Sequence, residues 1–344
     1  MTGKEKLYGK TLAELQAIAA AEGMPAFAAK QIAGWLYSKG VSEISNMTDL
    51  SLRSRAGLEE RYEVGIEPPV AESASKDGTK KYLFSLTGNR YIETAFIPDE
   101  DRATICVSSQ SGCRMGCRFC MTARQGFQGN LTSNEILNQF RSIPEHTRLT
   151  NMVYMGMGEP FDNLDEVLKS LEVLTSPWGY GWSPTRITVS TVGIVDKMQT
   201  FLDSTKCHLA VSLHSPFDHE REAMMPVQKA HPVKEVLDII RSFDFGRQRR
   251  VSFEYIVFKG MNDTPAHIKE LARILNGIKC RINLIRFHNI PGSEYSSPGL
   301  PEMVRFRDSL NDKGIIATIR ASRGEDINAA CGLLSTLKQN KGCA

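Results

Sequence analysis

The feature that most limits how this chain can fold is a regular alternation of strand-like and helix-like segments from about residue 101 onward. Short runs rich in β-branched and aromatic residues alternate with stretches in which apolar residues recur every three to four positions. The predicted strands are 104–108, 151–155, 186–190, 208–213, 251–258, 281–287 and 316–320, and helical stretches between them include 133–140, 164–171, 233–240 and 266–275. Such alternation predicts right-handed βαβ units and a parallel sheet. About seven strands fall short of the eight of a closed barrel, so we expect an α/β fold with an incomplete (β/α) TIM-like barrel.

The first hundred residues follow a different pattern. Residues 1–62 show helical periodicity, which predicts a small helical N-terminal domain. Two strand-like runs, 80–86 and 90–98, flank Thr87-Gly88-Asn89, and this arrangement indicates a β-hairpin. We therefore expect a linker and β-hairpin extension at 63–100, followed by the barrel and a C-terminal segment at 101–344.

Composition limits the partners and the compartment. The 344 residues include 42 Lys and Arg against 39 Asp and Glu, a net charge of +3. This balance excludes a protein that coats a polyanion, but it permits RNA binding through a local basic rim. The sequence has no long apolar run and no apolar segment near its start, so we expect no membrane contact and a cytoplasmic protein. In that reducing compartment, eight cysteines indicate metal ligands, catalytic thiols or buried apolar groups rather than disulfides.

Three of the cysteines, Cys113, Cys117 and Cys120, form a Cys-x-x-x-Cys-x-x-Cys motif just after the first predicted barrel strand. Neighbouring thiolates repel one another unless a cation stabilises them, so the motif predicts a metal centre. Structural zinc takes four protein ligands, yet Cys106 lies seven residues upstream and no histidine occurs between 101 and 144. A four-iron, four-sulfur cluster held by three cysteines leaves one iron open to a small molecule. The spacing therefore favours a catalytic 4Fe–4S cluster over zinc.

Two further motifs are weak by themselves. Gly158-Glu159-Pro160 follows the second barrel strand, where a carboxylate can pair with the ammonium group of a ligand, although such a tripeptide is more often a turn. Cys331 lies between Ala330 and Gly332 at a predicted strand-to-helix junction, where a thiol is approachable. A buried apolar role is the alternative for Cys331.

Together these residues resemble the RlmN/Cfr family of radical S-adenosylmethionine RNA methyltransferases. The motifs that carry the resemblance are 91–94, 106–110, 113–120, 125–127, 158–160, 212–216 and 323–332. Met121 and Leu333 depart from the residues common at those positions, and neither matches a residue with a chemical role. The resemblance implies a barrel of the radical S-adenosylmethionine type, with a 4Fe–4S cluster on Cys113, Cys117 and Cys120. It also implies that the helical N-terminal domain at 1–62 is RNA-binding-like.

S-adenosylmethionine is the second cofactor that the resemblance implies. The residues matching its contacts are Gly158, Glu159, Ser190, Ser212, Leu213, His214 and Asn289. Ser190 and Ser212 have an alternative role as helix caps, and His214 and Asn289 have one as turn residues.

The resemblance also implies a reaction with two protein thiols. In the family, one S-adenosylmethionine methylates the thiol matching Cys331, and a second supplies a radical that removes a hydrogen from that methyl group. The resulting methylene radical adds to an adenine carbon and ties enzyme to RNA. Release requires removal of the proton on that carbon and a second thiol, matching Cys106, that forms a disulfide with Cys331. Glu93 matches the proton acceptor, and Cys106 is a rival for that step.

By this resemblance we expect methylation of adenine C2 in the peptidyl-transferase region of 23S rRNA and of the adenosine beside the tRNA anticodon. We expect a monomer that receives electrons from an external, flavodoxin-like donor. The near alternative is the Cfr type, which modifies C8 of the same rRNA adenine; residues 125–127, 289–292 and 323–324 favour the C2 type. Two other classes are a zinc-bearing RNA-binding module and an enzyme that activates a second protein through a glycyl radical, and the latter gives Cys106 and Cys331 no task.

RNA contacts are less visible in the sequence than catalytic groups. The basic residues near the expected site, candidates for phosphate contacts or plain solvated charge, are Arg114, Arg118, Arg124, the run 247–250, Lys76, Lys80 and Lys81. Cys207 and Cys280 are expected to be core thiols, and Cys343 to lie in a tail.

Overall fold

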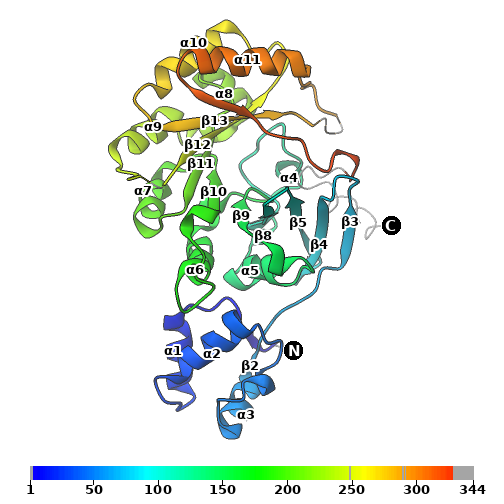
Figure 1. Ribbon diagram of the computed structural model, residues 1–344, viewed down its shortest axis with the longest axis vertical. Coiled ribbons are helices and arrows are strands. Elements are labelled where there is room, and N and C mark those ends of the chain that lie inside the picture. Colours follow the sequence, from blue (N-terminus) through cyan, green and yellow to red (C-terminus); the bar gives the residue numbers. More distant parts are fainter. Residues whose placement is uncertain (1–2, 248, 289, 291, 328–344) are drawn as a thin grey trace.

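The computed structural model describes residues 3–247, 249–288, 290 and 292–327. In this part of the chain ten strands form one mixed sheet, and its barrel portion is parallel (Figure 1). The parallel strands are β6 (Ala103–Cys106), β9 (Asn151–Tyr154), β10 (Ile187–Thr191), β11 (His208–Ser212), β12 (Val251–Val257), β13 (Cys280–Arg286) and β14 (Ile316–Ile319). They follow one another across the sheet in chain order, as in a (β/α) barrel. β14 and β3 form the two edges and do not pair with each other within the described residues, so the predicted incomplete barrel is confirmed.

Helices connect the parallel strands and, apart from the short α4 beside the cavity, cover the outer face of the sheet (Figure 1). They are α4 (Met121–Arg124), α5 (Ser133–Arg141), α6 (Leu164–Thr175), α7 (Val195–Ser204), α8 (Asp218–Met224), α9 (Val233–Ser242), α10 (Pro265–Leu275) and α11 (Leu300–Asp312). α5, α6, α9 and α10 coincide with predicted helical stretches. In α9 the buried residues are Val233, Val236, Leu237 and Ile240, the three-and-four spacing that places apolar side chains on one face.

Three antiparallel strands extend the sheet beyond β6. They are β3 (Ala71–Ala74), β4 (Lys80–Leu86) and β5 (Arg90–Pro98), and β5 pairs with β6. β4 and β5 form the predicted hairpin, and its turn places Gly88 and Asn89 at φ values of 81° and 56°. The loop between the paired Leu86 and Arg90 thus has three residues, and its last two have the positive φ values that Gly and Asn tolerate. The hairpin is therefore part of the barrel wall rather than a separate unit.

The N-terminal module consists of α1 (Leu12–Ala21), α2 (Ala28–Ala33), the π-helical turn η1 (Gly34–Lys39) and α3 (Leu52–Arg61). The structure adds a short parallel pair, β1 (Glu5–Lys6) with β2 (Tyr62–Glu63), that sequence patterning did not indicate. The side chains of Tyr8 and Tyr37 pack near Tyr180, and the two hydroxyls of Tyr8 and Tyr180 are 2.7 Å apart. The module therefore shares a core with the barrel.

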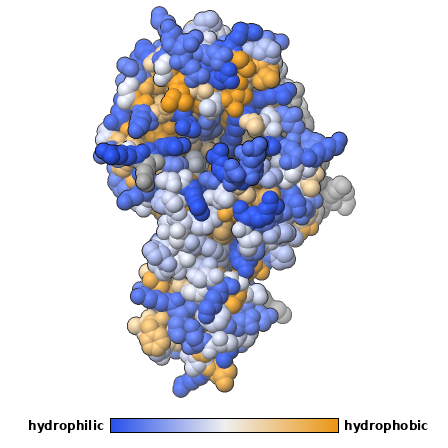
Figure 2. All heavy atoms as spheres, viewed as in Figure 1, coloured by the Kyte–Doolittle hydropathy of each residue, from blue (hydrophilic) through white to orange (hydrophobic). Residues whose placement is uncertain are grey.

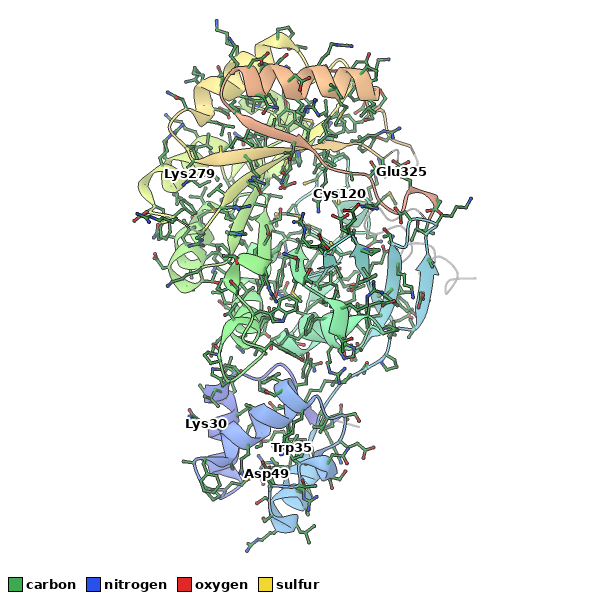
Figure 3. All side chains as sticks on the ribbon, in the orientation of Figure 1. Lys30, Trp35, Asp49, Cys120, Lys279 and Glu325 are labelled. Carbon is green, nitrogen blue, oxygen red and sulfur yellow. The ribbon has the colours of Figure 1, made fainter. Side chains whose placement is uncertain are left out.

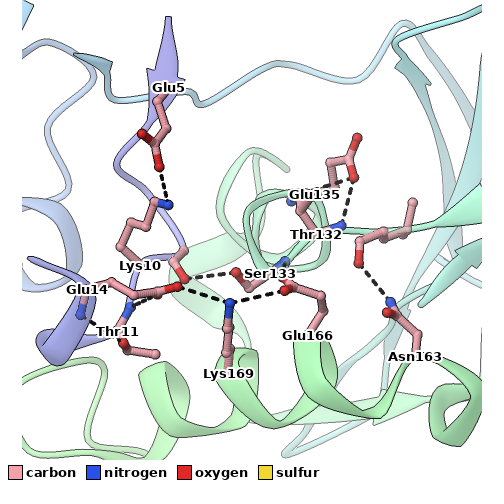
Figure 4. A network of polar contacts seen from close by, with 12 residues as sticks. Glu5, Lys10, Thr11, Glu14, Thr132, Ser133, Glu135, Asn163, Glu166 and Lys169 are labelled. Atoms are coloured by element: carbon pink, nitrogen blue, oxygen red, sulfur yellow. Dashed lines mark hydrogen bonds and ion pairs between the residues drawn. The ribbon is translucent and has the colours of Figure 1, made fainter. Parts of the chain in front are cut away.

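A polar network also joins the module to α5 and α6 (Figure 4). Lys169 of α6 bridges Glu14 of α1, at 3.0 Å, and Glu166, at 3.2 Å. Glu166 accepts a hydrogen bond from the Ser133 backbone N–H, and the Ser133 hydroxyl donates to the carbonyl oxygen of Gly9. These contacts fix the module against the outer face of the barrel.

The chain that follows β14 crosses the open side of the barrel and contacts the turn between β3 and β4 (Figure 1). Asp326 accepts a hydrogen bond from the Lys76 backbone N–H at 3.1 Å, and the Gly324 backbone N–H donates to Asp77 at 2.9 Å. Arg323 pairs with Asp99 at 3.2 Å. Figure 3 places Glu325 close to the ends of β3 and β4. Residues 320–327, called the strap below, thus connect the two edges of the sheet.

The surface facing the viewer in Figure 2 is mostly hydrophilic, with hydrophobic patches near α11 and β14. A narrow waist separates the N-terminal module from the barrel in this view. Among the described residues, no helix combines the length and the apolar character needed to cross a bilayer.

Candidate functional site

A cavity of about 320 Å³ lies at the carboxyl ends of the parallel strands. This size is within the range of small-molecule sites, and the position is where parallel α/β folds place their chemistry. The predicted site residues that line it are Cys113, Cys117, Cys120, Gly158, Glu159, Ser190, Ser212 and His214. The structure therefore brings together in one cavity residues that are up to 101 positions apart.

The three predicted cluster cysteines enter the cavity from the loop after β6. Burial raises the pKa of Cys113 to about 12 and that of Cys117 well above its usual value, and the neighbouring thiols raise both further. Thiolates in this position need a cationic partner, which is the chemistry of a metal-ligand set. Within the described chain, no three His, Cys, Asp or Glu side chains lie close enough to hold a single ion. A zinc ion, with Zn–S distances of about 2.3 Å, would draw three sulfurs to within about 4 Å of one another, whereas a four-iron cluster spaces them more widely.

The loop that carries these cysteines depends on Gly112. Its φ is +70°, and a Cβ atom at this position would lie 1.7 Å from the carbonyl oxygen of Gly126. Glycine is therefore required for the loop to fold back against residues 126–128. The Gln128 backbone N–H donates to Ser111 across the same contact.

Glu159 is 3% exposed and is held by backbone donors from two directions. Its carboxylate accepts from Phe161 N–H at 3.0 Å and from Val192 N–H at 2.8 Å. Burial raises the pKa of Glu159 to about 7, although the hydrogen bonds from Thr191, Val192 and Phe161 oppose the shift. A carboxyl group poised in this way gains most from a ligand that brings a positive charge or a hydrogen-bond donor.

His214 has a left-handed backbone conformation, with φ of 57°, which is uncommon for a residue other than glycine. Its Nδ1 accepts a hydrogen bond from Ile256 N–H at 3.0 Å, so the ring proton is on Nε2. Burial lowers the pKa of His214 to about 3, which keeps the ring neutral. The ring packs edge-on against Phe119 of the cysteine loop, with centroids 5.0 Å apart, so it links the loop to β11 and β12.

Ser190 and Ser212 lie near the ends of β10 and β11. The capping alternative for them is wrong, because the N-cap residues of α7 and α8 are Ile194 and Phe217. Arg221, which is fully buried, joins the ends of these strands: its Nη2 donates to the carbonyl oxygens of Val192 at 2.7 Å and Ser212 at 3.0 Å. Sequence patterning gave no sign of this arginine.

Register places Cys106 and Glu93 on the face of the sheet that bears the cavity. Cys106 pairs with Val153, which pairs with Thr188, and Ser190 is two residues further along the same strand. Paired residues share a face, as do residues two apart, so Cys106 points to the same side as Ser190. Ala95 is the partner of Cys106 on β5, and Glu93 is two residues before it. Thr94 points to the other face, where its hydroxyl bonds Gln139 of α5.

Several predictions of surface charge need correction. Lys81 is only 1% exposed and pairs with Glu93, so it is not part of an RNA-contacting surface. Lys80 forms ion pairs with Glu72 and Glu145. Arg249 donates to the carbonyl oxygens of Leu202 and Cys207 and lies over three aromatic rings, so it has a packing role. The different outcomes for Lys80 and Lys81 arise because adjacent residues of a strand face opposite ways.

The remaining predicted positions lie either in the core or outside the residues that the structure describes. Leu213 is fully buried and is not among the lining residues of the cavity. Cys207 is a core thiol as predicted, and Cys280 is half-buried. Asn289, Cys331 and Cys343 lie outside the described residues.

A polar group on β12, β13 and the strap was missed from sequence. Glu254 lines the cavity, accepts from Asn283 at 2.7 Å, and lies 3.7 Å from Arg320. Arg320 in turn reaches Met155 on the opposite side of the cavity. Ser212, Glu254, Asn283 and Thr318 form one register row across four strands. The sequence signal that could have indicated this group is the recurrence of polar residues within otherwise apolar predicted strands.

Comparison with known proteins agrees with this geometry. The family model of the radical SAM superfamily matches residues 107–274, and that of the ribosomal RNA large subunit methyltransferase N-terminal domain matches residues 6–64. A relative from Phocaeicola vulgatus, named "Probable dual-specificity RNA methyltransferase RlmN", is 58% identical over 340 residues, covering 99% of this chain and 97% of its own length. The "Dual-specificity RNA methyltransferase RlmN" of Desulfotalea psychrophila is 42% identical, covering 99% and 98%.

A solved structure supports the same assignment. The crystal structure of a radical SAM methyltransferase from Sphaerobacter thermophilus matches with a TM-score of 0.86 and 39% identity, covering 95% of this chain and 98% of that one. The radical SAM superfamily uses a 4Fe–4S cluster and S-adenosylmethionine, and the cysteine loop and cavity described above suit both. Identity at this level over the full length, together with both family models, shows that the chain belongs to the RlmN family of radical S-adenosylmethionine RNA methyltransferases.

Proposed function

We propose that this chain methylates C2 of an adenosine in the peptidyl-transferase region of 23S rRNA and C2 of the adenosine beside the tRNA anticodon. The observation that carries the proposal is the shared face of the sheet: the cysteine loop, the cavity, Cys106 and Glu93 all belong to it. The names of the relatives, which specify dual-specificity RNA methylation, support two kinds of RNA substrate.

In this proposal Cys113, Cys117 and Cys120 hold the 4Fe–4S cluster. When bound, the cluster exchanges single electrons, supplying the one that cleaves S-adenosylmethionine and taking one back later in turnover. Glu159 and the backbone beside Gly158 receive the amino group of S-adenosylmethionine, and Ser190, Ser212 and neutral His214 surround the rest of the molecule. Leu213 supports this wall from the core, and Asn289 completes the set by resemblance.

Cys331 is the thiol that carries the methyl group to the adenine carbon, a role that rests on the family resemblance. Release from the RNA adduct requires Glu93 to take the C2 proton, with Cys106 attacking the sulfur of Cys331. The S–S bond forms as the bond from sulfur to the new carbon breaks, and the electron pair of that bond stays with the carbon, which becomes a methyl group on protonation. The external, flavodoxin-like donor supplies the electron for the cleavage of S-adenosylmethionine, and reduction of the disulfide by two electrons and two protons from added reductant returns both thiols.

The test is anaerobic reconstitution with iron, sulfide, reductant and S-adenosylmethionine, followed by incubation with rRNA and tRNA fragments and mass spectrometry of the nucleosides. We expect 2-methyladenosine together with 5′-deoxyadenosine. A product consisting only of 8-methyladenosine would replace the C2 assignment by the Cfr-type reaction. Zinc in place of iron and sulfide, with no deoxyadenosine, would contradict the enzymatic proposal altogether.

A matched pair of variants tests the release step. Cys106→Ala is expected to retain deoxyadenosine formation and to accumulate RNA covalently bound to protein, because the adduct forms without this thiol and is resolved by it. Cys207→Ala, at a core thiol remote from the cavity, serves as the control and should not accumulate the adduct. Free methylated RNA at the wild-type rate from Cys106→Ala would contradict the assigned role.

A further inference from the structure

A buried ion pair lies on the cavity-bearing face of the sheet. Nζ of Lys81 on β4 is 2.6 Å from Oε2 of Glu93 on β5, and the two side chains are 2% and 3% exposed. A charged side chain at this depth is costly to bury unless it is paired, so each member offsets the burial cost of the other. Lys81 has no part in the function proposed above.

The register places this pair next to the second proposed thiol. Lys81 is opposite Ala95 on β5, and Ala95 is opposite Cys106 on β6, so the three residues form one row. Paired side chains point to the same face, and the small Ala95 between the two leaves room above it. Glu93 is diagonal to Lys81 on that face, because its own partner on β4 is Leu83. The ammonium group is therefore next to the proton acceptor and in the same row as the resolving thiol.

We propose that Lys81 is a positioning residue for the release step: it holds the Glu93 carboxylate in a fixed orientation until the adenine C2 proton is removed. This inference rests on the proposed function, since it assigns Glu93 the role of proton acceptor. A general base has to lie within hydrogen-bond reach of the proton that it removes, so loss of the Lys81 contact weakens the placement of the Glu93 carboxylate. Lys81 itself neither gains nor loses a proton; the proton moves from C2 to the Glu93 carboxylate.

The experiment separates adduct formation from release under single-turnover conditions, with excess reconstituted enzyme and an rRNA fragment. Denaturing gels follow the covalent adduct, and nucleoside analysis follows free methylated RNA. In Lys81→Met we expect the adduct to form at a rate within about tenfold of the wild type and to resolve at least about 100-fold more slowly, the usual contribution of a general base. Lys81→Arg keeps the charge, so release should recover to within about tenfold of the wild-type rate.

Lys80→Met is the matched control, because Lys80 is adjacent on the same strand and its ion pairs with Glu72 and Glu145 lie on the other face. Its release rate should equal that of the wild type. Deuterium at adenine C2 adds a second readout: release by Lys81→Met should slow further with the deuterated RNA, because breaking the C–H bond has become rate-limiting.

A double-mutant cycle covers the case in which Lys81→Met does not fold. Lys81→Met/Glu93→Gln has no charge left at this pair, and it should release RNA at the same slow rate as Glu93→Gln alone if Lys81 acts through Glu93. A further slowing in the double variant, or an unchanged release rate in folded Lys81→Met, would overturn the inference while methylation by the wild type upholds the proposed function. No methylated adenosine from the wild type would overturn both.

Discussion

Arg221 provides the sharpest test of how the cavity is built. Its guanidinium group is fully buried, and it donates to the carbonyl oxygens of Val192 and Ser212 and to the side chain of Gln228. Burial lowers the pKa of Arg221 to about 10, which still leaves it charged at neutral pH. In Arg221→Met the two strand ends lose the donor that joins them.

The magnitude follows from these contacts. Each hydrogen bond from a charged group contributes about 1.5–3 kcal/mol, so three contribute about 5–9 kcal/mol. Removing the buried charge recovers several kcal/mol of its desolvation cost, which leaves a net loss of about 3–5 kcal/mol. Since a domain is stable by only about 5–15 kcal/mol, Arg221→Met should fold marginally. Its affinity for S-adenosylmethionine should also fall, because Val192 N–H positions Glu159.

Urea unfolding followed by circular dichroism measures the stability, and equilibrium binding of S-adenosylmethionine to the reconstituted protein measures the effect on the cavity. Arg305→Met is the control, because Arg305 is on the surface of α11 and pairs only locally with Glu302 in the described chain; its unfolding midpoint should not move. A loss below about 1 kcal/mol in Arg221→Met with unchanged affinity would refute the claim that this guanidinium group holds the two strands together.

Two other predictions concern the cavity itself. Burial raises the pKa of Glu159 to about 7, so its carboxyl group is protonated below that pH. S-adenosylmethionine should therefore bind more tightly as the pH rises through 7. Glu159→Gln should lose this pH dependence when its affinity is measured in the same titration. A pH-independent affinity in the wild type would contradict this. Gly112→Ala brings a methyl group against the carbonyl oxygen of Gly126, so the iron and sulfide content after reconstitution should fall. The control is Gly126→Ala, because Gly126 also has a positive φ but open space around it. This variant should retain the cluster. Equal iron content in the two variants would show that the close approach at Gly112 is dispensable.

Periodicity predicted the barrel strands and most of the hairpin, because apolar side chains that face helices recur with a fixed spacing along each strand. It did not predict the pairing of β1 with β2, since two-residue strands have no period and their partners are more than fifty residues apart. The cysteine motif was informative because spacing and residue type limit the possible occupants of a metal site.

The polar residues of the barrel interior show where sequence reasoning stops. Lys80 and Lys81 are neighbouring residues of the same type, yet Lys80 is at the surface and Lys81 is buried beside Glu93. Only the register of β4 against β5 distinguishes them. Arg221 and Glu254 were missed for a related reason: a charged residue in a helix or strand is usually solvated, and the partners that make burial tolerable come from distant segments.

Beyond Arg320, whose backbone N–H donates to the carbonyl oxygen of Leu284 in β13, the strap completes the barrel wall without joining the strand ladder. Residues 323–326 reach the β3–β4 turn through hydrogen bonds that backbone amides donate to Asp side chains, and an ion pair from Arg323 reaches Asp99 just after β5. Detaching it would leave every strand pair of the sheet intact. A closed eight-stranded barrel admits its ligands only through its ends, whereas this wall has a seam along its side that can part independently of the global unfolding of the domain. The fold thereby combines rigid strands, which hold the cavity residues in register, with a side wall whose contacts can open without breaking the pairing of the strands.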